Sequence, residues 1–188
     1  MVKLVFLFLQ GAVFGWIWET VYCTVKNKKW ANRGFLYGPI VPIYGFGLLL
    51  AFSVYTLEER GAIPFLPVWT VFAAAFFISM VLEYFTSLLL EKLFHARWWD
   101  YSNMPLNIGG RTGVLTSLGF GAAGVPALRL AVPFLLRVYG EISFPLLEVF
   151  SFLAVMLLSA DITLTVSALT DFAARVSKMD ASFRDAME

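Results

Sequence analysis

The chain has 188 residues, of which 60% are apolar and only 14% are charged, and its formal net charge is +1. A soluble domain carries about 25% charged residues, so this composition excludes an ordinary soluble enzyme and predicts a membrane protein. The net charge identifies no partner; we expect membrane lipids around the chain and no nucleic acid. The single cysteine excludes an intrachain disulfide.

Five apolar segments approach the length of about 20 helical residues that crosses a bilayer. They cover residues 4–25, 36–57, 68–90, 113–139 and 144–169. We therefore expect an all-α, polytopic transmembrane domain over residues 1–170. Residues 171–188 place apolar side chains on one helical face, which predicts a cytoplasmic or interfacial amphipathic helix, or a helix that docks on the bundle.

The first two segments carry polar and helix-breaking residues. Gly11 and Gly15 have the spacing of a close helix contact, and the Glu19 carboxylate is costly in a membrane unless it is paired or hydrated. The second segment begins GPIVPIYGFG, where Pro39 and Pro42 lack N–H donors. Two interpretations stay open, an ordinary kinked helix and a half-helix or re-entrant segment whose exposed peptide groups line a site.

The later segments contain three charged residues at membrane depth. Glu83 lies about two turns inside the third segment, on the same helical stripe as Glu91, and we favour a polar site there over a structural ion pair. Glycines of residues 119–124 match a dinucleotide-binding pattern, but no strand precedes them, so we interpret them as helix-packing residues. Asp161 and Arg129 differ in depth by roughly 12 Å. We therefore expect no direct pair, and expect Arg129 to reach toward the opposite interface.

The loop of residues 91–111, EKLFHARWWDYSNMPLNIGGR, concentrates charge, aromatic rings and turn formers between two spans. Trp98, Trp99 and Tyr101 are residue types that settle at a membrane–water boundary, and Asp100 lies among them. The simple interpretation is an aromatic belt beside a solvated loop. We expect a site instead, because polar residues from other segments reach the same side.

Basic residues predict the orientation. With the N-terminus outside, ten of the 14 Lys and Arg residues lie on the cytoplasmic side, three outside and Arg129 within the membrane, as the positive-inside rule requires. The C-terminus is then cytoplasmic, although a re-entrant second segment would reverse the later spans. We predict that Arg33, Arg97 or Arg111 pairs with an acidic residue around a cavity open to the cytoplasm, where the expected acidic partners are Glu19, Glu83 and Asp100. The expected site contains no metal and comprises Glu19, Asn32, Arg33, Tyr37, Pro39, Pro42, Tyr44, Glu83, Glu91, Arg97, Trp98, Trp99, Asp100, Tyr101, Asn107, Arg111 and Asp161.

Three strings, NRGFLYGPIVPIYGFG, LEYFTSLLLEKLFHARWWDYS and NIGGRTGVLTSLGFG, resemble a family of bacterial membrane proteins known as putative ABC-transporter type IV, or CmpB-like. The resemblance covers about residues 16–124 and implies a multi-pass protein of the bacterial cytoplasmic membrane. The family's characteristic positions correspond to Glu19, Asn32, Arg33, Gly34, Tyr37, Gly38, Pro39, Pro42, Tyr44, Gly45, Glu83, Glu91, Trp98, Trp99, Asp100, Tyr101 and Asn107.

Three functions remain open at this point. A permease-like transport component ranks first; the chain has no phosphate-binding loop, so an ATPase would be a separate subunit, and a homo-oligomer would enlarge a small pathway. An intramembrane enzyme acting on a lipid or small amphiphile could use Glu83 and Asp100 as acid and base, yet no nucleophile with a paired base stands out. The third is a scaffold whose partner carries the activity. No cofactor is expected.

Overall fold

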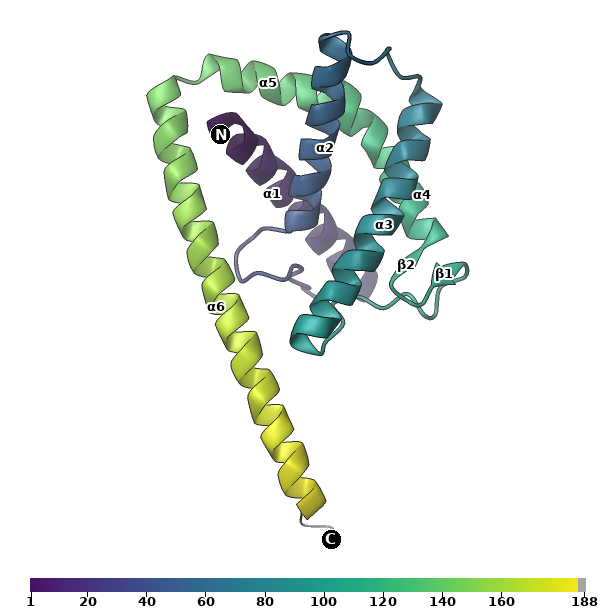
Figure 1. Cartoon of the computed structure of the whole chain (residues 1–188), viewed down its shortest axis with the longest axis vertical. Coiled ribbons are helices and arrows are strands. Elements are labelled where there is room, and N and C mark those ends of the chain that lie inside the picture. The colour runs from purple at the N-terminus through teal and green to yellow at the C-terminus, as the bar shows by residue number, and fades with distance from the viewer. Residues whose placement is uncertain (186–188) are drawn as a thin grey trace.

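The computed structural model describes the backbone of residues 1–185 and the side chains of residues 1–170. It is a bundle of α-helices in which α1 packs against α2 and α3 packs against α4 (Figure 1). The helices are α1 Val2–Asn27, α2 Pro42–Glu59, α3 Val68–Phe94, α4 Val114–Pro126, α5 Val132–Glu141 and α6 Phe144–Asp185, with a π-helical turn, η1 Ala127–Ala131, between α4 and α5. The strands β1 Asn107–Ile108 and β2 Thr112–Gly113 form a short antiparallel hairpin.

The expected all-α membrane architecture is confirmed. Within the described residues, four helical segments are long and apolar enough to cross a membrane: Val2–Asn27, Val68–Phe94, Val114–Glu141 and Phe144–Thr170. The second expected span is the exception. Helix α2 has 18 residues, about 27 Å at 1.5 Å per residue, and it ends in two glutamates. The expected count of five is therefore approximate.

Helix α2 also begins later than the sequence predicts. Residues 36–41 are not helical, and the helix starts at Pro42, where a missing N–H costs no intrahelical hydrogen bond. The backbone before it is partly tied down, because the Val41 N–H donates to the Ala12 carbonyl (3.0 Å). The GPIVP sequence therefore does not kink a helix; it forms an irregular segment that leads into one.

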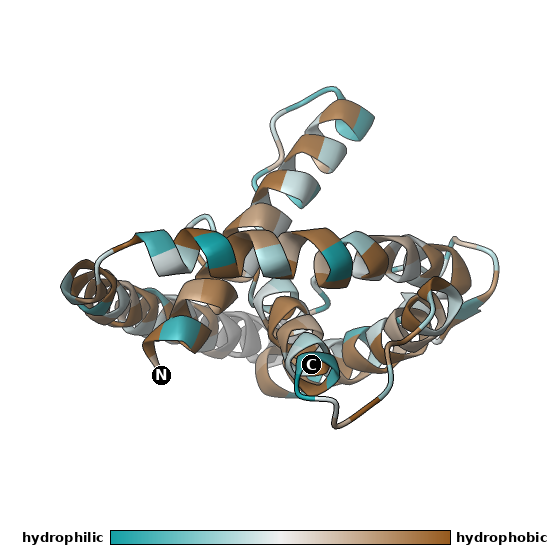
Figure 2. Cartoon of the chain, turned by 90° about the horizontal axis from the view of Figure 1, so that it is seen from above, coloured by the Kyte–Doolittle hydropathy of each residue, from teal (hydrophilic) through white to brown (hydrophobic). Residues whose placement is uncertain are grey.

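The fourth expected span, residues 113–139, is divided by the π-turn. Pro126 and Pro133 flank the turn, and each lacks the N–H that a regular helix would use. After the turn, α5 runs across the end of the bundle (Figures 1 and 2). Its apolar residues cover a core formed by Phe6, Leu7 and Leu147, so the apolar core lies at the end where α1 begins.

Small residues set the close helix contacts, as predicted. A Cβ on Gly11 would lie 2.8 Å from the Tyr44 carbonyl oxygen, and one on Gly15 would overlap the Tyr44 ring. Gly121 packs in the same way against Phe72 of α3 and Gly124 against Ala75, which confirms the packing interpretation for these two glycines; Gly119 faces open space.

Helix α6 continues through residue 170 to Asp185 without a break and extends beyond the other helices (Figure 1). The amphipathic face expected over residues 171–188 falls on side chains outside the described residues.

Candidate functional site

The carboxylate of Glu83 lies at the opposite end of the bundle from the apolar core, and the residue is only 4% exposed. Two hydroxyl groups donate to it, Tyr101 to Oε1 at 3.0 Å and Thr112 to Oε2 at 2.9 Å. The Thr116 hydroxyl lies 3.3 Å from Oε2 and shares its proton with the Gly113 carbonyl, which is nearer at 2.8 Å. The threonines reach it because β2 and the first turn of α4 pack on α3. Among the described side chains, none of the partners of Glu83 is basic.

The prediction that an arginine pairs with Glu83 is therefore wrong, because the loop arginines pair with Glu91 instead. Arg97 Nε lies 3.3 Å from Glu91 Oε1, and Arg111 Nη1 is paired with Glu91 Oε2. Arg111 also donates to the Ser87 hydroxyl at 3.4 Å. Glu91 lies two helical turns nearer the loop than Glu83. It therefore pairs with both guanidinium groups, and neither extends to the deeper Glu83 carboxylate.

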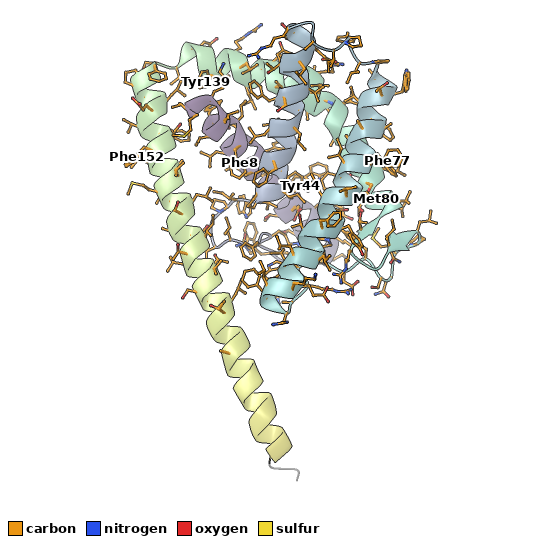
Figure 3. All side chains as sticks on the ribbon, in the orientation of Figure 1. Phe8, Tyr44, Phe77, Met80, Tyr139 and Phe152 are labelled. Carbon is orange, nitrogen blue, oxygen red and sulfur yellow. The ribbon has the colours of Figure 1, made fainter. Side chains whose placement is uncertain are left out.

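A second carboxylate, Glu19 of α1, lies within electrostatic range of the first. The Tyr44 ring packs directly on Gly15, which brings its hydroxyl to Glu19 one helical turn further along α1. Figure 3 shows Tyr44 where α2 approaches α3, and its ring centroid lies 5.6 Å from that of Phe120 on α4. Glu19 and Glu83 are near enough to repel each other. Arg33 is within electrostatic reach of Glu19, although no ion pair forms among the described side chains.

Tyr101 joins these groups from the loop. Burial raises the pKa of its hydroxyl far above the usual value, and the carboxylates of Glu83 and then Glu19 add to the increase, while Arg33 opposes it. The Tyr101 hydroxyl therefore stays protonated and acts as a hydrogen-bond donor. We call Glu19, Tyr44, Glu83 and Tyr101 the two-carboxylate site.

Asp161 of α6 forms a separate polar contact. The backbone N–H groups of Tyr37 and Gly38 donate to its two carboxylate oxygens at 3.0 and 2.9 Å, and the Thr165 hydroxyl donates at 3.2 Å. A Cβ on Gly38 would lie 2.8 Å from Asp161 Oδ2, so glycine permits the approach. The irregular segment before α2 thus does expose its peptide groups to a polar partner, but the partner is this chain's own carboxylate.

The aromatic residues of the loop organise the loop itself. Trp98 packs edge-on against Phe35 and Phe94, with ring centroids 5.2 and 5.8 Å apart. The indole N–H of Trp99 donates to the Arg111 carbonyl at 2.8 Å. These contacts hold the loop against the ends of α3 and of the segment before α2.

Asp100 and Asn107 fix the turns of the same loop. The Asp100 carboxylate accepts from the Ser102 hydroxyl at 2.5 Å and from its N–H at 2.9 Å, and these bonds lower the pKa of Asp100, with a smaller contribution from Arg97. The expected pairing of Asp100 with an arginine is thus replaced by contacts within the turn. Asn107 donates to the Met104 carbonyl at 2.8 Å and accepts from the Gly110 N–H at 2.9 Å.

Of the expected site residues, the structure brings Glu19, Tyr44, Glu83 and Tyr101 together, with Arg33 in electrostatic reach. The others form contacts outside this group or lie in the irregular segment before α2 and at its start: Asn32, Tyr37, Pro39, Pro42, Glu91, Arg97, Trp98, Trp99, Asp100, Asn107, Arg111 and Asp161. Sequence reasoning missed Thr112 and Thr116. Thr112 belongs to β2 and Thr116 to the first turn of α4, so no helical spacing in the sequence linked them.

Arg129 lies at the other end of the bundle, as expected, and makes no pair with Asp161. Its guanidinium forms two contacts with the Glu58 carboxylate, at 2.5 and 3.0 Å, and donates to the Leu66 carbonyl at 2.6 Å. It also stacks over the Phe65 ring, 4.0 Å from the centroid. These contacts bind the turn between α2 and α3 to η1.

Comparison with known proteins gives one match. The family model described as "Putative ABC-transporter type IV" matches residues 6–166, a range that contains the two-carboxylate site and Asp161. Comparisons with curated proteins and with solved structures give no match.

Proposed function

Because the chain belongs to the "Putative ABC-transporter type IV" family of helical membrane proteins, we propose that it is the membrane component of a transporter. In this proposal, the two-carboxylate site binds a positively charged group of the transported molecule. The observation that carries it is the environment of Glu83, a buried carboxylate held by hydroxyl groups alone among the described side chains.

Charge at the site supports a cationic ligand. Glu19 and Glu83 contribute two negative charges, and Arg33 is the basic group in electrostatic reach of Glu19, so the site carries an excess of one negative charge when both acids are ionised. Ionisable groups at membrane depth commonly mark the path of an ion or substrate. A monovalent cationic group would offset the repulsion between the carboxylates and part of the cost of their burial.

The aromatic groups support the same ligand class. The Tyr44 and Phe120 rings pack together beside Glu19, and aromatic faces attract ammonium groups. Tyr101 stays protonated and donates to Glu83, a role in binding rather than in nucleophilic chemistry. This arrangement favours transport over an intramembrane enzyme.

The proposed orientation places the N-terminus outside and the site at the cytoplasmic face of a bacterial membrane, following the ten-to-three distribution of basic residues. A separate ATPase subunit would supply the energy. Helix α6 extends beyond the bundle on that side.

A deletion strain tests the proposal. The strain is complemented with the wild type, with Glu83→Gln, or with Glu59→Gln, whose exposed carboxylate at the end of α2 serves as the matched control. Intracellular metabolites are then compared, and the tagged protein is used to capture a nucleotide-hydrolysing partner. We expect cationic metabolites to change in the deletion strain. Glu83→Gln should reproduce that change at wild-type protein level, whereas Glu59→Gln should restore the wild-type profile.

If Glu83→Gln restored the wild-type profile, the two-carboxylate site would have no part in the function. A change confined to anionic metabolites would contradict the assigned ligand class. Accumulation of a lipid precursor would favour the enzyme instead.

A further inference from the structure

The C-terminal part of α1 has an apolar face that stays exposed among the described residues. Trp18 is 61% exposed, Tyr22 55% and Val25 73%. Helix α2 packs on α1 at Gly11 and Gly15 but begins only at Pro42, so it does not extend along this face. Figure 2 shows α1 leaving the bundle beyond its crossing with the other helices.

A shallow groove of about 300 Å³ runs along this face. It is lined by Trp18, Val21, Tyr22, Val25 and Lys26, and its walls are almost entirely carbon. Lys26 is the one charged lining residue, and its ammonium group lies 5.8 Å from the centroid of the Tyr22 ring. The groove is therefore apolar along its length and positive at one end.

Two more lysines follow closely after Lys26 in the sequence. The helix ends at Asn27, and Lys28, with φ 51°, turns the chain away, so that Lys28 and Lys29 emerge beside Lys26 as exposed side chains. No aspartate or glutamate occurs in residues 20–57. The preceding acid, Glu19, lies beside the Tyr44 hydroxyl. These three lysines have no acidic neighbour in their own stretch of chain and are complementary to a negatively charged group.

We propose that this end of α1 binds an anionic phospholipid, with one acyl chain along the groove and the phosphate among Lys26, Lys28 and Lys29. Tryptophan and tyrosine settle near the membrane–water boundary. Along α1, Tyr22 lies about 6 Å and Trp18 about 12 Å from Lys26, at 1.5 Å per residue. A basic cluster at the end of a membrane span attracts anionic lipid, and each lysine changes the affinity by about fivefold. This binding site is independent of the two-carboxylate site, which has the opposite charge.

Quenching of tryptophan by brominated lipid tests the proposal. The full chain is placed in nanodiscs of phosphatidylcholine that contain a fixed fraction of either brominated phosphatidylglycerol or brominated phosphatidylcholine. The difference between the wild type and Trp18→Phe isolates the quenching of Trp18. We expect the anionic lipid to quench Trp18 more strongly than the zwitterionic lipid at equal fraction.

Lysine variants and a second tryptophan provide the controls. Lys26→Gln, Lys28→Gln and Lys29→Gln should each lower the preference for the anionic lipid by about fivefold; glutamine and lysine have similar helix propensity, so α1 stays intact. Lys3→Gln, at the other end of α1, should leave it unchanged. Trp69, exposed at the start of α3, should be quenched equally by both lipids. Equal quenching of Trp18 by both lipids would overturn the proposal, as would lysine variants with an unchanged preference or a Trp18 that neither lipid reaches because a protein covers it.

Discussion

Replacing Asp161 with asparagine should weaken the contact between α6 and the segment that precedes α2. In the wild type, the carboxylate accepts one hydrogen bond from each of two successive peptide N–H groups, those of Tyr37 and Gly38. Asparagine keeps one acceptor oxygen and turns its NH₂ group toward the other N–H, so one bond is lost. Hydrogen bonds to charged groups contribute about 1.5–3 kcal/mol each. Because one such bond is lost and Tyr37 is exposed, we expect the free energy of unfolding to fall by about 2 kcal/mol, in the lower part of this range.

Thermal unfolding of the purified protein measures this loss. A change of about 2 kcal/mol in a chain of this size corresponds to a decrease in Tm of about 4–8 °C. Thr163→Val is the matched control on the same helix, because the Thr163 hydroxyl is exposed and donates only to the Ser159 carbonyl of its own helix. Hydrogen exchange at Tyr37 and Gly38 should accelerate in Asp161→Asn alone. If Asp161→Asn melts with the control and both amides keep their protection, the contact does not stabilise the bundle.

Arg129→Lys keeps the charge but loses the two-point contact with Glu58, so Tm should fall by an amount equivalent to about 1–2 kcal/mol; an unchanged Tm would contradict this. Because the pKa of Tyr101 is raised in the folded protein, its contribution to stability is complete below the ordinary tyrosine pKa of about 10 and is lost as the pH rises above it. The wild type should therefore lose stability more steeply than Tyr101→Phe above about pH 10, and identical alkaline profiles would refute the assignment. In a cysteine-free background, Glu59→Cys should be labelled from outside intact cells and Arg97→Cys should not; outside labelling of position 97 would reverse the proposed topology.

Helix packing was the part of the fold most accessible from the sequence. Apolar content alone predicted a helical membrane protein, and the spacing of Gly11 and Gly15 predicted a close contact. Both follow from rules that act locally along one helix. The sequence could not show that the contacting group is Tyr44, because the contact depends on where α2 begins.

The environment of Glu83 shows which polar contacts the sequence could not predict. Its depth in the membrane could be counted along the helix, and so could the presence of arginines in the next loop. The partner of Glu83 could not be predicted in this way. It depends on the hairpin that places Thr112 beside Glu83 and on the ion pair between Glu91 and Arg111. The donors to Asp161 are backbone groups, which no side-chain pattern identifies.

The bend between α4 and α5 likewise depends on contacts outside its own segment. Pro126 and Pro133 flank the bend, but two prolines define neither the direction of a bend nor its site. The position of η1 depends on tertiary contacts, among them the binding of Arg129 to Glu58 in a distant turn.

The central claim, that Glu83 belongs to a site for cationic groups, is tested most directly by thermal shift of the purified protein. Sodium, ammonium, choline and a diamine are compared with acetate, succinate and inorganic phosphate at constant ionic strength, for the wild type, Glu83→Gln and Glu59→Gln. The account predicts that at least one cation raises the Tm of the wild type and of Glu59→Gln and leaves Glu83→Gln unchanged. Stabilisation by the anions alone, or the same cation response in Glu83→Gln, would contradict it.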